Sequence, residues 1–219
     1  MGFEAQIINT DIVTQVYDQL RKAIFSNSVF KVGEKINIDK LSLDWKISKT
    51  PIREALKALE KENVVKHIPR KGFFVSVLEV DEMRDLSDLR EALEIHALRK
   101  GFETIDRKRM KKFVSDFRKA HDVMVKTGAV EPYLEVDDEF HFYIIQSSNN
   151  KKMAAVYETM KNSLKLLRFR DTLVFEADMG KTLPEHEEII QAILDGDKSK
   201  AVETLCKHLS NVENRLYSK

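Results

Sequence analysis

The stretch Ser48-Lys49-Thr50-Pro51-Ile52-Arg53-Glu54-Ala55-Leu56-Lys57-Ala58-Leu59 decides the fold of the first part of this chain. Ser48 or Thr50 can cap a helix whose first turn contains Pro51, where the missing N–H leaves no helical hydrogen bond unmade. The apolar residues recur at helical spacing and form one inner face, which consists of Ile52, Ala55, Leu56 and Leu59. Lys49, Arg53 and Lys57 are four residues apart and follow the other side. The stretch therefore predicts an amphipathic helix with a basic outer face, ending near Asn63.

The flanking residues predict the rest of a winged helix-turn-helix. A first helix runs from Thr10 to about Ser26, and Asn37 caps a short second helix, which a turn at 46–48 joins to the third. Two β-rich runs, 64–68 and 73–77, follow and predict a hairpin. In this fold the third helix enters the major groove of DNA, and its first turns reach base edges. The hairpin turn, Arg70-Lys71-Gly72, adds two cations and a glycine that lets the backbone approach DNA closely.

The charge distribution along the chain supports this interpretation, although the net charge alone argues against a nucleic-acid partner. The 219 residues include 37 Lys or Arg and 36 Asp or Glu, which gives a net charge of +1. Residues 1–77 hold 13 of the basic and 9 of the acidic residues, a net of +4, which leaves −3 for residues 78–219. A basic segment joined to a mildly acidic body is typical of nucleic-acid-binding proteins.

The composition predicts a mostly helical, cytoplasmic globular protein. Hydrophobic residues make up 42% of the chain, enough for a buried core, while 7 Gly and 4 Pro leave little room for long loops. The single cysteine, Cys206, excludes an intramolecular disulfide, and we expect it to be a small core residue. No apolar run approaches the roughly 18 residues of a membrane span, and residues 1–10 lack the layout of a signal peptide. We therefore expect no membrane partner.

Residues 78–219 predict an antiparallel bundle of six helices and contain no strand pattern. The expected helices are one that Asp81 caps, one that Gly128 ends, and four over 132–148, 151–172, 184–195 and 198–217. In the first of them, we expect an inward stripe that consists of Met83, Leu86, Leu89, Leu93 and His96. The fold class is thus mainly α, with an N-terminal winged helix-turn-helix domain over residues 1–77 and a C-terminal helical domain over 78–219.

Three of the six histidines, together with one aspartate, predict a divalent metal site in the helical domain. Asp137 and His141 are four residues apart in a helical stretch, so both side chains lie on one face and can bind one ion. His186 and His208 lie on the last two helices, which a tight turn joins, so they can reach the same height in the bundle. Such pairs also occur by chance, and spacing alone leaves ordinary hydrogen-bonded histidines as the alternative. We expect His96 and His121 to be core or cavity-wall residues.

The chain also resembles a known family. Ser48-Lys49-Thr50-Pro51-Ile52-Arg53-Glu54-Ala55-Leu56 and Arg70-Lys71-Gly72-Phe73-Phe74-Val75 are similar to the paired motifs of GntR bacterial transcription regulators. The resemblance implies DNA contacts from Lys49, Thr50 and Arg53, and from the wing around Gly72. Lys49 stands where the family usually has Arg, and Lys cannot form the planar bidentate bond to guanine. Asp39 stands where some members have a DNA-contacting Arg, and Lys46 and Asn63 replace residues that are commonly Gly.

The second domain resembles the ligand-binding domain of the FadR subfamily. The motifs that carry this resemblance are Asp85-Leu86-Ser87-Asp88-Leu89-Arg90-Glu91-Ala92-Leu93-Glu94, Asp137-Asp138-Glu139-Phe140-His141, Glu185-His186-Glu187-Glu188-Ile189-Ile190 and His208-Leu209. The resemblance implies that Asp137, His141, His186 and His208 bind a metal beside a small organic acid, and that Arg90 can pair with a carboxylate of that effector. An ordinary ion pair of Arg90 remains the alternative. Four protein ligands would close a tetrahedral Zn²⁺ site, whereas Mn²⁺ or Ni²⁺ would keep two positions open.

These observations favour a ligand-responsive transcription regulator that is not an enzyme. Helix-turn-helix proteins usually read two half-sites as dimers, so we expect a homodimer on a palindromic double-stranded DNA operator. One alternative is a metal-dependent hydrolase of the HD type, since His121-Asp122 is an HD pair, but this leaves residues 1–77 unexplained. Another alternative is a regulator that senses the metal ion itself.

Overall fold

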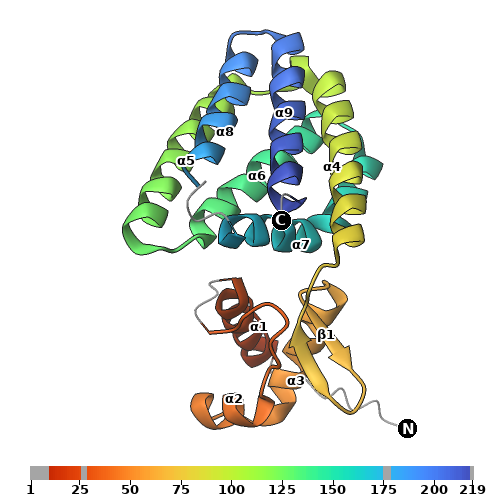
Figure 1. Cartoon of the computed structure of the whole chain (residues 1–219), viewed down its shortest axis with the longest axis vertical. Helices are drawn as coiled ribbons and strands as arrows, with labels where there is room; N and C mark the ends of the chain where they lie inside the picture. Colours follow the sequence, from red (N-terminus) through yellow and green to blue (C-terminus); the bar gives the residue numbers. More distant parts are fainter. Residues whose placement is uncertain (1–9, 26–28, 175–178, 218–219) are drawn as a thin grey trace, which may run out of the picture. The chain divides into compact units, whose positions relative to one another are not determined.

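Helix α3 (Lys49–Lys61) is the centre of the N-terminal unit, Met1–Val77, one of two compact units into which the chain divides (Figure 1). The structure is a computed structural model, and it describes residues 10–25, 29–174 and 179–217. The inner face that the sequence predicts is buried throughout, because Ile52, Ala55, Leu56 and Leu59 are all inaccessible to solvent. Ser48 is the N-cap residue of α3, although its side chain makes no capping hydrogen bond. The predicted helix break at 26–28 lies outside the described residues.

The other elements of this unit confirm the winged helix-turn-helix. Helix α1 (Thr10–Phe25) packs on α3, and the Asn37 side chain caps α2 (Ile38–Trp45) by accepting a hydrogen bond from the Lys40 N–H. Strands β1 (Val65–Ile68) and β2 (Gly72–Val75) pair antiparallel. The wing is therefore a short two-stranded sheet that follows α3 directly.

The two connections that flank α3 have left-handed backbone. Lys46, which ends α2, has a φ of 54°, and Asn63, just after α3, has a φ of 58°. These are the two positions at which the related motif commonly has glycine, the residue that adopts positive φ without steric cost. These two departures from the family pattern therefore lie at positions where the backbone favours glycine, and the steric cost falls on Lys46 more than on Asn63, because asparagine tolerates this conformation.

Six α-helices are described in the C-terminal unit, Leu78–Lys219, as the sequence predicts. They are α4 (Val80–Gly101), α5 (Arg107–Thr127), α6 (Glu131–Ser147), α7 (Lys151–Val174), α8 (Met179–Leu194) and α9 (Lys198–Tyr217), with a short 3-10 turn at Phe102–Thr104. Helix α6 packs against α4, α5 and α7, while α8 and α9 pack on each other after the tight turn at Gly196 (Figure 1). Among the described residues, no helix has the length and hydropathy that crossing a membrane would require.

Three details of this unit differ from the prediction. Helix α4 begins at Val80, because Glu79 and Glu82 form a reciprocal capping box there and Asp81 is already inside the helix. Helix α8 begins at Met179, so Pro184 lies inside it and not in its first turn. The buried face of α4 carries Arg90 and Glu94, while Leu89 is 41% exposed and His96 is also exposed. An ion pair between Arg90 and Glu94, described below, makes burial of that polar face tolerable.

Helices α4 and α6 approach each other closely at Gly101. A Cβ atom at this position would lie 2.3 Å from the carbonyl carbon and oxygen of Ser147 on α6. The Thr104 hydroxyl donates a hydrogen bond to the carbonyl oxygen of Ser147, with an O···O distance of 2.6 Å. This contact fixes the crossing of two helices that both contribute to the polar cluster described next.

Candidate functional site

Four polar side chains converge inside the C-terminal unit. Asp137 and His141 come from α6, His186 from α8 and His208 from α9, and all four are buried. One ligand atom from each of them can be chosen so that all these atoms lie within 4.8 Å of one another. The structure therefore brings together the four residues that the sequence singles out as a metal-ligating set.

The ε nitrogens of the histidines face the centre of this cluster. His186 Nε2 lies 3.0 Å from Asp137 Oδ1 and 3.3 Å from His141 Nε2. His208 Nε2 is buried and has no hydrogen-bond partner in the described part of the chain. Ligand atoms bound at about 2.0–2.1 Å to one zinc ion are about 3.3 Å apart in tetrahedral geometry. The two distances from His186 Nε2 are close to this value, and the 3.7 Å between His141 Nε2 and Asp137 Oδ1 is slightly longer.

The δ nitrogens of the same rings contact other polar groups. His141 Nδ1 lies 2.6 Å from Glu94 Oε2, and His208 Nδ1 lies 2.8 Å from Glu185 Oε2. His186 Nδ1 lies 3.1 Å from the Tyr133 hydroxyl. Metal-bound histidines almost always have a partner of this kind on the second nitrogen, which orients the ring.

Burial favours the neutral form of His186 and of His208. It lowers the pKa of His186, and it lowers the pKa of His208 to about 3 together with the nearby His186. Burial alone would raise the pKa of Glu94, but Arg90 and His141 hold it well below its usual range, so this carboxylate is charged. Neutral imidazoles offer the lone pairs that a metal ion requires.

The charges around the cluster also fit a divalent cation. Asp137, Glu94 and Glu185 supply three carboxylates within or next to the cluster, and Arg90 supplies one guanidinium. With neutral histidines, these four groups together carry a net charge of −2, which is the charge that a divalent ion balances. Nitrogen ligands with one carboxylate suit Zn²⁺, Ni²⁺ and Mn²⁺ better than Ca²⁺ or Mg²⁺, which prefer oxygen ligands.

Arg90 is 2% exposed, and in the described part of the chain its guanidinium is bound through Nε. Its Nε–H donates to Glu94 Oε1 over 2.7 Å, and the Tyr157 hydroxyl donates to the same oxygen over 2.9 Å. Its Nη2 is buried and has no hydrogen-bond partner in the described part of the chain. The ordinary ion pair of Arg90, which the sequence leaves as an alternative, thus exists with Glu94. The Nη2 group of Arg90 can nevertheless still donate a hydrogen bond to a ligand.

The candidate DNA-contacting residues are exposed on the N-terminal unit. Lys49, Thr50 and Arg53 lie in the first two turns of α3. Arg70 and Lys71 lie exposed in the turn of the wing, and Gly72 has a φ of 104°. These positions agree with a recognition helix and a wing tip.

Lys49 already has a partner within the N-terminal unit. Its Nζ lies 2.6 Å from Asp39 Oδ1, and this hydrogen bond lowers the pKa of the Asp39 carboxyl. The family departures at positions 39 and 49 are therefore in direct contact.

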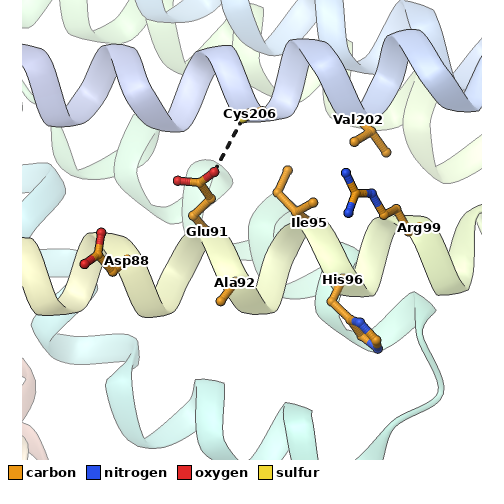
Figure 2. A pocket seen from close by; sticks show the side chains of 8 residues that line it. All are labelled: Asp88, Glu91, Ala92, Ile95, His96, Arg99, Val202 and Cys206. Carbon is orange, nitrogen blue, oxygen red and sulfur yellow. Dashed lines mark hydrogen bonds between the residues drawn. The ribbon is translucent and has the colours of Figure 1, made fainter.

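The remaining residues of interest lie outside the cluster. His96 lines an open surface hollow of about 530 Å³ between α4 and α9, together with residues such as Glu91, Arg99 and Cys206 (Figure 2). Cys206 is half-buried, and its thiol donates to Glu91 Oε1 over 3.5 Å. His121 is half-buried beside Tyr133 and is not one of the four clustered ligands. The HD pair therefore contributes no ligand to the cluster.

The sequence did not identify the partners Glu94, Glu185 and Tyr133. The sequence positions of two of them could have pointed to their role, since Glu94 is one helical turn from Arg90 and Glu185 directly precedes His186. Nothing in the sequence points to Tyr133, because its contact with His186 depends on how α6 packs against α8.

Two family models match this chain. Residues 12–75 match "Bacterial regulatory proteins, gntR family", and residues 85–211 match "FCD domain". Among curated relatives, the Nta operon transcriptional regulator of Aminobacter aminovorans is 32% identical over 65% of this chain and 67% of its own length. The gluconate operon transcriptional repressor of Bacillus licheniformis is 27% identical over 90% of this chain and 82% of its own length.

Solved structures share the fold. A transcriptional regulator GntR from Rhodococcus sp. RHA1 superposes with a TM-score of 0.78 at 21% identity, covering 95% of this chain and 98% of that one. The Zn²⁺-bound FCD domain of TM0439 superposes with a TM-score of 0.52 at 24% identity, covering 66% of this chain and 100% of that one. The families and relatives are transcription regulators and not enzymes, so the hydrolase alternative is wrong.

Proposed function

The chain belongs to the gntR family of bacterial regulatory proteins and carries an FCD domain; from this premise we propose that a small carboxylate, bound beside a divalent metal ion in the FCD domain, changes its affinity for an operator. The coarser function, a transcription regulator with an N-terminal DNA-binding domain and a C-terminal ligand domain, follows from the family itself. We place its action in the cytoplasm, where bacterial DNA lies.

The convergence of three buried histidines and one aspartate carries this proposal. Asp137, His141, His186 and His208 would hold the ion, which would supply a Lewis acid for an anionic ligand. The net negative charge of the groups around the cluster supports it, as does His208 Nε2, which has no hydrogen-bond partner in the described part of the chain. The FCD domain of TM0439 is Zn²⁺-bound in its solved structure, so zinc is the first ion to test, with Ni²⁺ and Mn²⁺ next.

The available donor of Arg90 supports a carboxylate as the effector. A buried guanidinium with a free N–H forms a strong, charge-assisted hydrogen bond with an anion. One relative is named for gluconate, which is itself a small organic acid. Arg90 would orient the acid, and Glu94 would keep the guanidinium in place.

Ligand binding can affect DNA binding because the cluster draws on three helices. The four candidate ligands come from α6, α8 and α9, so a bound ion and acid favour the arrangement of these helices that fits them best. In the N-terminal domain, Lys49, Thr50 and Arg53 would contact bases, and Arg70, Lys71 and Gly72 would contact the minor groove or phosphates. A homodimer on a palindromic operator would pair two such domains.

The test measures binding to a palindromic duplex that the wild-type protein selects from a random-sequence pool. We expect zinc together with one member of a panel of mono-, di- and tricarboxylic acids to change the affinity for this duplex. His186→Ala should abolish zinc binding and the response to the acid, whereas His121→Ala should keep both. Arg90→Gln should keep zinc binding but lose the response to the acid.

Arg53→Ala tests the DNA side of the proposal, with Lys207→Ala on the other domain as its control. Loss of bidentate base contacts should weaken binding to the selected duplex by about 1–3 kcal/mol or more. A response to zinc alone, with no further effect of any acid, would identify a metal sensor. Retained zinc binding in His186→Ala, or full affinity in Arg53→Ala, would contradict the respective assignment.

A further inference from the structure

The three histidines of the cluster have chemically different partners on their outer nitrogens. His141 and His208 face carboxylates, those of Glu94 and Glu185, whereas His186 faces the phenol of Tyr133. A carboxylate can only accept a hydrogen bond, but a phenol can accept one or donate one. The partners of His141 and His208 therefore restrict which ring nitrogen carries the proton, whereas the partner of His186 does not.

The carboxylates decide the tautomers of two rings. Glu94 Oε1 already accepts hydrogen bonds from Arg90 and Tyr157, and its Oε2 faces His141 Nδ1. His141 must therefore carry its proton on Nδ1 and present the lone pair of Nε2 to the cluster. Glu185 accepts from the Asn211 amide with one oxygen and faces His208 Nδ1 with the other, which gives the same result.

The third ring has acceptors on the cluster side. His186 Nε2 lies 3.0 Å from Asp137 Oδ1 and 3.3 Å from His141 Nε2, whose lone pair points inward. These neighbours favour a proton on His186 Nε2 as long as no cation is bound, and the Tyr133 hydroxyl then donates to Nδ1. A cation at Nε2 requires the proton on Nδ1, and the Tyr133 oxygen can then accept it.

We propose that Glu94 and Glu185 are positioning residues that fix His141 and His208 with protonated Nδ1, whereas Tyr133 lets the His186 proton move from Nε2 to Nδ1 when a metal ion binds. Two ligands are thus ready for the ion in advance, and one rearranges. The part about Glu94 and Glu185 stands without a metal, while the rearrangement of His186 rests on the proposed function.

Histidine tautomers can be observed directly in the full-length protein. Long-range nitrogen–proton NMR spectra of protein with nitrogen-labelled histidine distinguish protonated Nδ1 from protonated Nε2. Without metal, we expect His141 and His208 to be protonated on Nδ1 and His186 on Nε2. Addition of zinc should move the proton of His186 alone.

Glu94→Gln is the sharpest variant. The amide oxygen of the new side chain must face the two donors Arg90 and Tyr157, so its NH₂ group faces His141 Nδ1 and forces the proton to Nε2. We expect this change of tautomer in the spectrum, and a zinc affinity about 10- to 100-fold weaker than in the wild type. Glu91→Gln, three residues away beside Cys206 (Figure 2), should change neither.

Two further variants keep the proposal testable if Glu94→Gln does not fold. Glu185→Gln should give His208 a mixture of both tautomers, and Tyr133→Phe should weaken zinc binding while leaving His186 protonated on Nε2. Unchanged tautomers in both Gln variants, or a His186 protonated on Nδ1 before zinc is added, would overturn the inference. A wild-type protein that shows the expected tautomers but binds no zinc would instead refute the proposed metal function and the rearrangement of His186.

Discussion

At the scale of single residues, the N-terminal unit shows a lysine held by an aspartate on the helix before it. Asp39 is charged, because the hydrogen bond from Lys49 lowers its pKa, and it lies where other members of the family can have an arginine. A negative charge beside the recognition helix opposes binding to phosphates. We therefore expect the pair to limit the affinity for DNA of any sequence.

Asp39→Asn should strengthen binding to non-specific duplex DNA several-fold. The substitution removes one negative charge and releases Lys49 for the phosphates, so the salt dependence of binding should steepen by about one counterion. Fluorescence anisotropy over a range of salt concentrations measures both quantities. Asp44→Asn, an exposed position on the same helix, makes the same charge change away from Lys49, and an equal effect of both variants would contradict the role of the pair.

Residue types and spacings singled out the four candidate ligands, and the resemblance to a known family strengthened that prediction, but neither identified their partners. Asp137 and His141 share a helix face whatever the packing, which makes them visible in the sequence. The contacts of Glu94, Glu185 and Tyr133 depend on how far each helix is rotated and shifted against its neighbours. Periodicity alone does not contain this information.

At the scale of the elements, the predicted order of helices and strands is confirmed, and the main error concerns the rotation of α4. Its apolar residues suggested an inward stripe through Leu89 and His96, yet the helix buries Arg90 and Glu94. Hydrophobic periodicity cannot anticipate a buried polar network, because the partners that satisfy it, such as Tyr157 on α7, come from elsewhere in the sequence.

Lys46→Gly should stabilise the N-terminal unit by about 1 kcal/mol, because Lys46 adopts a left-handed backbone at a steric cost that glycine does not have. Urea unfolding followed by the fluorescence of Trp45, the single tryptophan, reports on this unit. Lys40→Gly, inside α2, should instead destabilise it by about 1 kcal/mol. If both substitutions are destabilising, strain at Lys46 is not the explanation.

Gly101→Ala should destabilise the C-terminal unit by about 1–3 kcal/mol, since the new methyl group would overlap the backbone of Ser147. Far-UV circular dichroism during thermal unfolding measures the loss. Lys100→Ala, at the neighbouring exposed position of the helix, should stay within about 0.5 kcal/mol of the wild type. A fully stable Gly101→Ala protein would show that α4 and α6 can separate there without cost.

At the scale of the whole molecule, the two units differ in the polarity of their interiors, since the C-terminal unit buries charged groups in addition to an apolar core of its own. The described N-terminal unit has a small apolar core around α3, whereas the C-terminal unit places a charged cluster inside its helices. A cation at that cluster would stabilise the folded state of its own unit, since the separated ligands of the unfolded chain bind it weakly.

Zinc should raise the stability of the C-terminal unit by about 4 kcal/mol at roughly 1,000 times its dissociation constant, and a chelator should reverse the effect. The circular-dichroism transition should move with zinc, while the Trp45 fluorescence transition, which reports on the other unit, should not. His208→Ala removes one ligand and should abolish the shift. A transition that zinc leaves unchanged in the wild type would exclude a tightly bound ion.

The origin of the four candidate ligands on three helices also has a kinetic consequence. With an ion bound, His208 is tied to His141 and His186, so α9 cannot swing away from α6 and α8 unless a coordination bond breaks first. Amide hydrogen exchange in the middle of α9 would then proceed no faster than the ion dissociates from His208. The lifetime of the bond between the ion and His208 would thus limit the rate at which the helices of this domain separate.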